Sequence, residues 1–236
     1  MMQLLWLVLG VVLGVLGEPV SRPVRRRVVT ARRWRRGRQP LLDARVPAFG
    51  VDWSYGSLSP SQLRRVGAEF ACRYLSDDVD KDLSLRESRR LGRAGIRRIV
   101  VWETTAERAL QGYMAGVIDR ASAGARLRAL GAPAGTAIYF AVDADVSGEE
   151  VEQYFRGLDA PLAADRRDGY QIGVYGGYDI VDYLWQHQLV LYAWQTAAWS
   201  DDRWHPRASI LQYSFDHVLD GVSVDFDRVV HDPGWW

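Results

Sequence analysis

The sequence predicts an α/β protein, a compact (β/α)8 barrel of the TIM type in which some helices are short or missing. From residue 47 onward, short apolar runs alternate with helix-like stretches, which is typical of β/α units and a mainly parallel sheet. Eight of these runs qualify as strands. The chain has 236 residues, 48% of them hydrophobic, which is enough to bury one full core in a single barrel domain.

The first half of the predicted barrel contains two short helices. Ser59 and Pro60 start the first, because serine caps a helix end well and proline fits the first turn. The second runs from Ser84 to Gly95, where glycine favours a stop. The strands that we expect, in chain order, are residues 48–52, 69–74, 97–103, 136–143, 171–175, 189–194, 208–213 and 222–226.

Two longer helices are predicted at residues 106–131 and 148–165. Gly131 closes the first, and Ser147 with Glu150 three residues later resembles a capping box for the second. The gap from 194 to 208 lacks helical periodicity, so no full helix is expected there.

The chain divides into three segments. Residues 1–17 contain an uncharged apolar stretch, short for a membrane-spanning helix, and read as a signal-like or membrane-anchor segment. Residues 18–45 form an Arg-rich linker with ten arginines against Glu18 and Asp43, and residues 46–236 form the barrel domain. The protein is thus either membrane-anchored or secreted to the cell envelope, although arginines following an apolar segment oppose export. A misassigned start is the alternative.

Composition excludes several classes of site. The formal net charge is +1, and arginine dominates over the single lysine, Lys81, which fits a GC-rich genome better than a nucleic-acid site. One cysteine, Cys72, excludes an intrachain disulfide, and the four histidines lack zinc-binding spacing. We therefore expect no metal and no cofactor, and the oligomeric state stays undetermined.

Acidic residues stand where the predicted strands end. In a barrel of this kind the carboxyl ends of the strands form the active-site face, so acids that are distant in sequence would meet there. Glycoside hydrolysis needs such a group, with one carboxyl protonated and others ionised. A single strand-end aspartate is more often a turn or cap residue, so the argument depends on convergence. The candidate catalytic acids are Asp52, Glu103, Asp143, Asp145 and Asp225, supported by Asp227.

Asp143 and Asp145 are two residues apart on the predicted fourth strand. Side chains at i and i+2 point to the same face of a strand, so their carboxyl groups can influence each other. Asp145, followed by Val146 and Ser147, also fits a simple helix-cap role.

Aromatic residues supply the second signal, because ten Trp and eleven Tyr far exceed six Phe. Flat rings with a polar edge suit stacking on sugars, although filling of the barrel core is the alternative for each ring. Near the ends of strands six and seven, two glutamines are placed to bind sugar hydroxyls or an N-acetyl group. The candidate substrate-binding residues are Trp53, Tyr55, Trp102, Tyr139, Tyr175, Trp194, Gln195, Gln212 and Asp227.

Four segments carry a resemblance to a known family. They are Phe49-Gly50-Val51-Asp52-Trp53-Ser54, Ile138 to Asp145, Ile172-Gly173-Val174-Tyr175-Gly176-Gly177, and Leu211-Gln212-Tyr213 through Asp225 and Asp227. Together they resemble the glycoside-hydrolase-like domain of unknown function 1906 of actinobacteria and their phages, and more distantly the family 25 lysozymes. The resemblance covers about residues 47–232. It implies a barrel fold, a cell-wall glycan such as peptidoglycan as ligand, and supporting roles for Asp52, Asp143 and Asp225.

The resemblance also exposes a departure. Asp145 occupies the place of the catalytic glutamate of the lysozymes and is one methylene shorter, a misplacement that can cost ~100-fold in rate. Three hypotheses follow. The leading one is a glycosidase that acts on cell-wall polysaccharide by carboxylate acid catalysis from Asp145 or Glu103. The others are a catalytically inactive glycan-binding protein and a membrane-tethered envelope scaffold.

Overall fold

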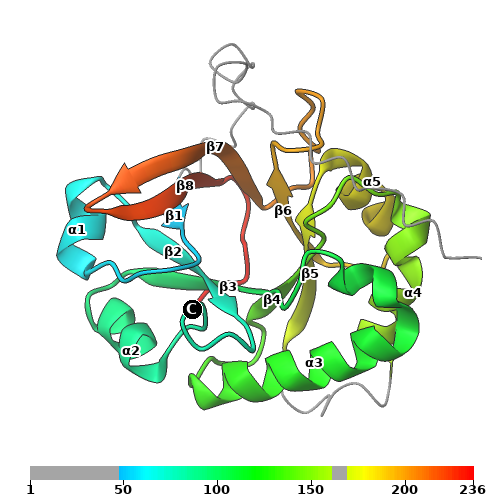
Figure 1. The fold of residues 1–236 in the computed structure, drawn as a ribbon, viewed down its shortest axis with the longest axis horizontal. Coiled ribbons are helices and arrows are strands. Elements are labelled where there is room, and N and C mark those ends of the chain that lie inside the picture. Colours follow the sequence, from blue (N-terminus) through cyan, green and yellow to red (C-terminus); the bar gives the residue numbers. More distant parts are fainter. Residues whose placement is uncertain (1–47, 161–168) are drawn as a thin grey trace, which may run out of the picture.

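A computed structural model describes residues 48–160 and 169–236, which form a closed barrel of eight strands in chain order around the ring (Figure 1). The predicted barrel is confirmed, and each expected strand is present with ends displaced by a few residues. The strands are β1 (Ala48–Asp52), β2 (Phe70–Leu75), β3 (Arg97–Trp102), β4 (Ala137–Ala141), β5 (Gln171–Gly176), β6 (Tyr192–Thr196), β7 (Ile210–Leu219) and β8 (Val222–Val229).

The last strand runs against the rest of the barrel. Neighbouring strands from β1 to β7 are parallel, whereas β8 pairs antiparallel with both β7 and β1. Asp220 and Gly221 join β7 to β8 with φ of 50° and 84°, as a tight hairpin of the Asp-Gly kind requires. The expectation that Asp225 and Asp227 end a parallel eighth strand is therefore wrong. They lie within β8, where Asp225 is the register partner of Asp52.

In the described part of the chain, five α-helices flank the ring and leave the β7–β8 side without one (Figure 1). They are α1 (Pro60–Arg65), α2 (Leu85–Arg93), α3 (Gly112–Ala129), α4 (Gly148–Leu158) and α5 (Tyr178–Gln186). The expected caps are present: Ser59 accepts a hydrogen bond from a backbone N–H group, and Ser147 forms a capping box with Glu150. Ser84 also accepts a backbone hydrogen bond at the start of α2. The stretch from 197 to 209 has no helix, as expected.

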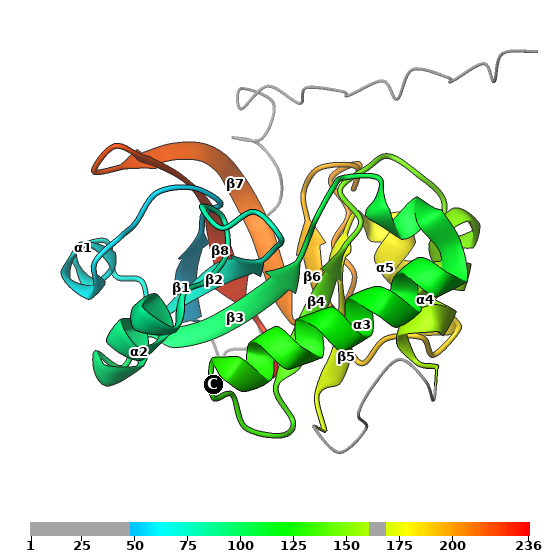
Figure 2. The same ribbon diagram turned by 60° about the horizontal axis from the view of Figure 1, so that its bottom comes forward.

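The third helix begins later than its sequence pattern indicates. A 3-10 turn at Arg108–Gln111 precedes α3, which then runs along the outside of the barrel beside α4 (Figure 2). Glycines allow this close packing: a Cβ on Gly116 would lie 2.0 Å from the carbonyl oxygen of Tyr154. The two helix backbones therefore touch.

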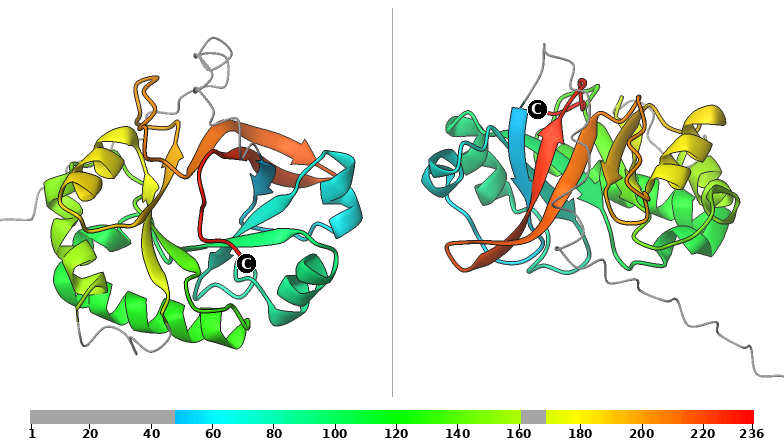
Figure 3. Two further views of the ribbon diagram at one scale, coloured as in Figure 1. Left: turned by 180° about the vertical axis from the view of Figure 1, so that it is seen from behind. Right: turned by 90° about the horizontal axis from the view of Figure 1, so that it is seen from above.

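The C-terminal segment closes one end of the barrel, visible in the view from behind (Figure 3). Gly234 accepts a hydrogen bond of 2.8 Å from the backbone of Ala137, and Trp236 exchanges two with the backbone of Arg98. Trp235 packs on Phe70 inside the barrel, with 5.9 Å between the ring centroids. Because these partners lie at the amino ends of β2, β3 and β4, the segment closes the bottom, and the opposite end is left for a site.

The predicted helix at 148–165 is shorter than expected, because α4 ends at Leu158 with Asp159 as its C-cap. Three predicted segments lie outside the described residues: the signal-like segment 1–17, the Arg-rich linker 18–45 and residues 161–165. Within the described part of the chain, no helix is long and apolar enough to cross a membrane.

Candidate active site

The top of the barrel carries polar side chains that point inward. Successive residues of a strand face opposite sides, so Asp52 continues the inward row of Ala48 and Gly50, and Gln212 the row of Ile210. Asp52 and Gln212 are buried, at 3% and 2% exposure, and Asp225 is half-buried. The acids predicted on β1 and β8 therefore meet.

Gln212 holds these two acids together. Its Nε2 donates a hydrogen bond of 2.8 Å to Oδ2 of Asp52 and one of 3.3 Å to Oδ2 of Asp225. Its Oε1 accepts one of 2.9 Å from the hydroxyl of Tyr175 on β5. Because both carboxyl groups need a donor and Tyr175 needs an acceptor, only one orientation of the amide satisfies all three. The side chain predicted to bind sugar instead organises the acids.

Asp227 lies deeper in the barrel, with no exposed surface. Its Oδ1 accepts a hydrogen bond of 2.9 Å from Nε1 of Trp194 on β6, and its carboxyl group lies close enough to that of Asp52 for each to act on the pKa of the other. The thiol of Cys72 also contacts it. Asp227 and Trp194 are thus part of the support beneath Asp52, in place of the substrate contacts that the sequence predicted.

The three aspartates have raised pKa values with a common cause. Burial raises the pKa of Asp52 to about 6, against the lowering effect of its hydrogen bond from Gln212. Burial and the neighbouring Asp52 raise the pKa of Asp225 to about 7, and the same two causes hold the pKa of Asp227 well above its usual range. Carboxyl groups in one site thus differ in their affinity for a proton, as acid catalysis requires.

Glu103 follows β3 at the same end of the barrel. It forms an ion pair of 2.6 Å with Lys81, whose ammonium group lies 4.2 Å from the ring centroid of Tyr74. Its charge acts on Asp52, which places it beside the carboxyl cluster. Sequence reasoning missed Tyr74 and Lys81. The alternation of β2, which turns Phe70 and Cys72 inward, was the available signal for Tyr74.

The fourth strand ends earlier than expected, at Ala141, so the strand argument that pairs Asp143 with Asp145 does not apply. Asp143 is half-buried, and its charge raises the pKa of Tyr175, Tyr74 and Asp225, so it belongs to the cluster. Asp145 lies in a bend and is exposed. A catalytic role for Asp145 stays a prediction.

Several predicted sugar-stacking rings are buried. The alternation that turns Asp52 and Glu103 inward turns their neighbours Trp53 and Trp102 outward beneath the helices, at 1% and 2% exposure. Tyr139 points down the barrel and donates a hydrogen bond of 2.9 Å to the carbonyl of Pro233. These three predictions are corrected to core roles. Tyr55 differs, because it is 55% exposed and its hydroxyl bonds Asp78.

Gln195 is also corrected. It is fully buried outside the barrel, where it donates to Ser200 and to the carbonyl of Arg203 and accepts from the backbone of His205. It therefore shapes the β6–β7 loop. A third residue missed from the sequence is Arg73, which is 1% exposed, pairs with Glu87 at 2.8 Å and favours the charged form of Asp52.

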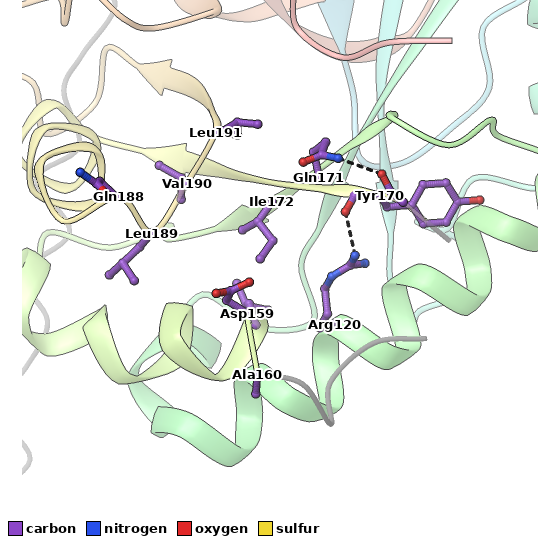
Figure 4. Close-up of a pocket in the computed structure, with 12 residues that line it drawn as sticks. Arg120, Asp159, Ala160, Tyr170, Gln171, Ile172, Gln188, Leu189, Val190 and Leu191 are labelled. Carbon is purple, nitrogen blue, oxygen red and sulfur yellow. Dashed lines mark hydrogen bonds between the residues drawn. The ribbon is translucent and has the colours of Figure 1, made fainter. Parts of the chain in front are cut away.

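A separate cavity of about 370 Å³ lies between the sheet and the ends of α4 and α5 (Figure 4). Arg120 donates a hydrogen bond of 2.8 Å to the carbonyl of Tyr170 at its edge. The cavity surrounds the start of β5, at the bottom of the barrel, and none of the candidate acids lines it. Its lining includes Ala160 and Gly169, which flank residues 161–168, so we assign no site to it.

Comparisons with known proteins agree with this architecture. The Rv2525c protein of Mycobacterium tuberculosis, whose name gives peptidoglycan hydrolase activity as a proposal, is 29% identical over 205 residues, covering 79% of this chain and 82% of that protein. The crystal structure of this Tat-secreted protein with L-tartrate matches with a TM-score of 0.72 and 26% identity over 80% of this chain and 98% of that one.

More distant structures share the fold alone. The spore cortex lytic enzyme SleM of Clostridium perfringens has a TM-score of 0.53 at 12% identity, covering 78% of this chain and 67% of that one.

A family model described as Rv2525c-like, glycoside hydrolase-like domain matches residues 61–231. That span is most of the sequence, and it includes β2 to β8 with Gln212 and the acids of β8. The chain therefore belongs to the Rv2525c-like glycoside hydrolase-like domain family.

Proposed function

We propose that the protein hydrolyses glycosidic bonds in a cell-wall polysaccharide, with peptidoglycan as the first substrate to test. One observation carries the proposal: Asp52 and Asp225 bond the same amide nitrogen of Gln212 at the top of the barrel and have pKa values of about 6 and about 7. Near neutral pH such a group combines ionised and protonated carboxyls, which is what cleavage of a glycosidic bond uses.

Asp225 is the proton donor in this proposal. Its pKa of about 7 leaves a large protonated fraction at neutral pH, and its half-buried position lets a substrate reach it. The backbone N–H of Asp216 donates a hydrogen bond of 2.8 Å to its Oδ1, so one oxygen is held in place. Asp52, with its pKa of about 6, is the ionised carboxylate that stabilises positive charge on the sugar ring, and Asp143 lies beside it in the cluster.

The other two acids fit the donor role less well. Glu103 is engaged in its ion pair with Lys81. Asp145 is exposed, and no hydrogen bond or ion pair joins it to another described residue. This assignment replaces the donor that the sequence suggested by one that has the burial needed to retain a proton.

The substrate class rests on the relative with the highest identity given above. Rv2525c carries a name that proposes peptidoglycan hydrolysis, and it is described as Tat-secreted. By analogy we place this protein at the cell envelope, facing its wall. A reporter fused at residue 45 would test the location, and a cytoplasmic signal would contradict it.

Release of reducing ends from purified peptidoglycan tests the activity. The full chain is compared with Asp225→Asn, Asp145→Asn and the control Asp220→Asn, which changes an aspartate in the turn of the same hairpin that pairs with Arg65. We expect release by the unmodified chain and by Asp145→Asn and Asp220→Asn, with a loss of 100-fold or more, on the order of the effect of one acid catalyst, in Asp225→Asn. Full activity in Asp225→Asn would refute the assignment of the donor.

A glycan-binding role without cleavage gives a different result. Wall binding without release by any form of the chain would indicate that role.

A further inference from the structure

Asp227 is the most deeply buried acid of the cluster. Trp194 satisfies its Oδ1, whereas its Oδ2 meets no N–H or O–H donor among the described residues. The carboxyl group of Asp52 lies beside it, close enough for each to act on the pKa of the other. Two carboxylates are both acceptors, so a hydrogen bond between them requires a proton on one of them.

The surrounding donors decide which acid carries that proton. Asp52 already accepts a hydrogen bond of 2.8 Å from Gln212, and Arg73 lies close enough to favour its charge. Asp227 has no exposed surface, and the indole of Trp194 is its one N–H or O–H donor among the described residues. An ionised Asp227 would leave a buried oxygen unsatisfied, which costs more than leaving the proton in place.

We propose that Asp227 is a positioning residue that keeps its proton throughout the working pH range and donates it in a hydrogen bond to Asp52. Asp227 acts through Asp52: the bond fixes the orientation of that carboxylate from below, while Gln212 fixes it from the side. The inference rests on the proposed function, because it refines the roles within the same site.

The groups that face Asp227 come from several strands. Asp52 faces it from β1, Cys72 from β2 and Asp225 from its own strand, with Tyr213 of β7 within electrostatic range. All of these are acids, and any charge that they carry is negative. The surroundings therefore reinforce the retention of the proton.

Carbon-13 NMR of the aspartate carboxyl groups in the full-length chain tests the inference, with Asp227→Asn, Asp227→Ala and the control Asp220→Asn. We expect one carboxyl signal of the unmodified protein to stay protonated up to pH 8 and to vanish in Asp227→Asn. The asparagine amide can still donate to Asp52. The titration midpoint of Asp52 therefore moves upward in Asp227→Ala and is restored toward a lower pH by Asp227→Asn.

Two results would overturn the inference. One is that every aspartate signal titrates below pH 8 in the unmodified protein, and the other is that the protonated signal persists in Asp227→Asn. If Asp227→Ala fails to fold, the carboxyl signals of the unmodified protein and of Asp227→Asn still test the inference. The readout is proton occupancy and not sugar release, so an inactive protein that shows the protonated signal would refute the proposed function alone.

Discussion

Replacing Gln212 with methionine tests how the carboxyl cluster is held together. Methionine has a similar length and no donor, so the variant loses the hydrogen bonds to Asp52 and Asp225 and the one from Tyr175. At pH 5, below the pKa of about 6 of Asp52, that carboxyl is mostly protonated, and three neutral hydrogen bonds of about 0.5–1.5 kcal/mol each give a loss of roughly 1.5–4.5 kcal/mol.

The cost grows as the pH rises. Near pH 8 the unmodified protein holds Asp52 ionised against Gln212, and a charged hydrogen bond contributes about 1.5–3 kcal/mol, so the loss is larger than at pH 5 by about 1–2 kcal/mol. The unfolded chain releases this proton near pH 4. The hydrogen bond from Gln212 lowers the pKa of Asp52, so without it the folded pKa rises above about 6. Stability of the variant therefore continues to fall with pH above 6, where in the unmodified protein the contribution of Asp52 has levelled off.

Urea unfolding at pH 5, 6, 7 and 8 measures this difference. The control is Gln195→Met, a glutamine on the next strand whose partners are a hydroxyl, a carbonyl and a backbone N–H, none of which titrates in this range. We expect a destabilisation that is independent of pH for Gln195→Met and one that increases with pH for Gln212→Met. A pH-independent loss in Gln212→Met would refute the electrostatic role of Gln212.

Three further predictions follow from the geometry. Gly116→Ala is expected to lower the unfolding free energy, measured by urea titration, by about 3 kcal/mol, because its Cβ would lie 2.0 Å from a backbone oxygen of Tyr154. The control Gly176→Ala should lower it far less, because the nearest atom to its Cβ is 3.3 Å away. Deletion of residues 232–236 removes Trp235 and the backbone partners of Ala137 and Arg98, and a thermal melt should show a fall of roughly 10 °C. Reducing-end release should decrease as pH rises through about 7, because Asp225 then loses its proton, and a rate that increases from pH 7 to 9 would contradict its role as donor.

The strands and caps could be predicted because their signals are local. Ser59, Ser84 and Ser147 stand at helix starts for reasons contained within four residues of sequence, and the inward position of Asp52 follows from strand alternation. The same alternation, applied to the neighbouring residues, would have placed Trp53 and Trp102 outside the barrel. A ring that is adjacent in sequence to an inward-pointing acid lies on the opposite face of the sheet, so nearness to an acid does not place it in the site.

The direction of β8 has a signal in the sequence. Asp220 and Gly221 between two runs of strand-forming residues indicate a tight hairpin, which requires antiparallel strands. Other features depend on contacts between distant segments. The pairing of Lys81 with Glu103 and the role of Gln212 arise only when the barrel closes, and no local pattern contains them.

The closure of the barrel also has a consequence for how the chain folds. The first strand pairs with the last, Gly50 beside Asp227, and the C-terminal segment then packs against residues near the start of β2, β3 and β4. Contacts between such distant parts of a chain form slowly, because a long loop must be ordered before they add stability. Until β8 arrives, β1 and β7 are open sheet edges that can pair with other chains. Protein yield should therefore depend on chaperones and on low expression temperature more than on the final stability of the barrel.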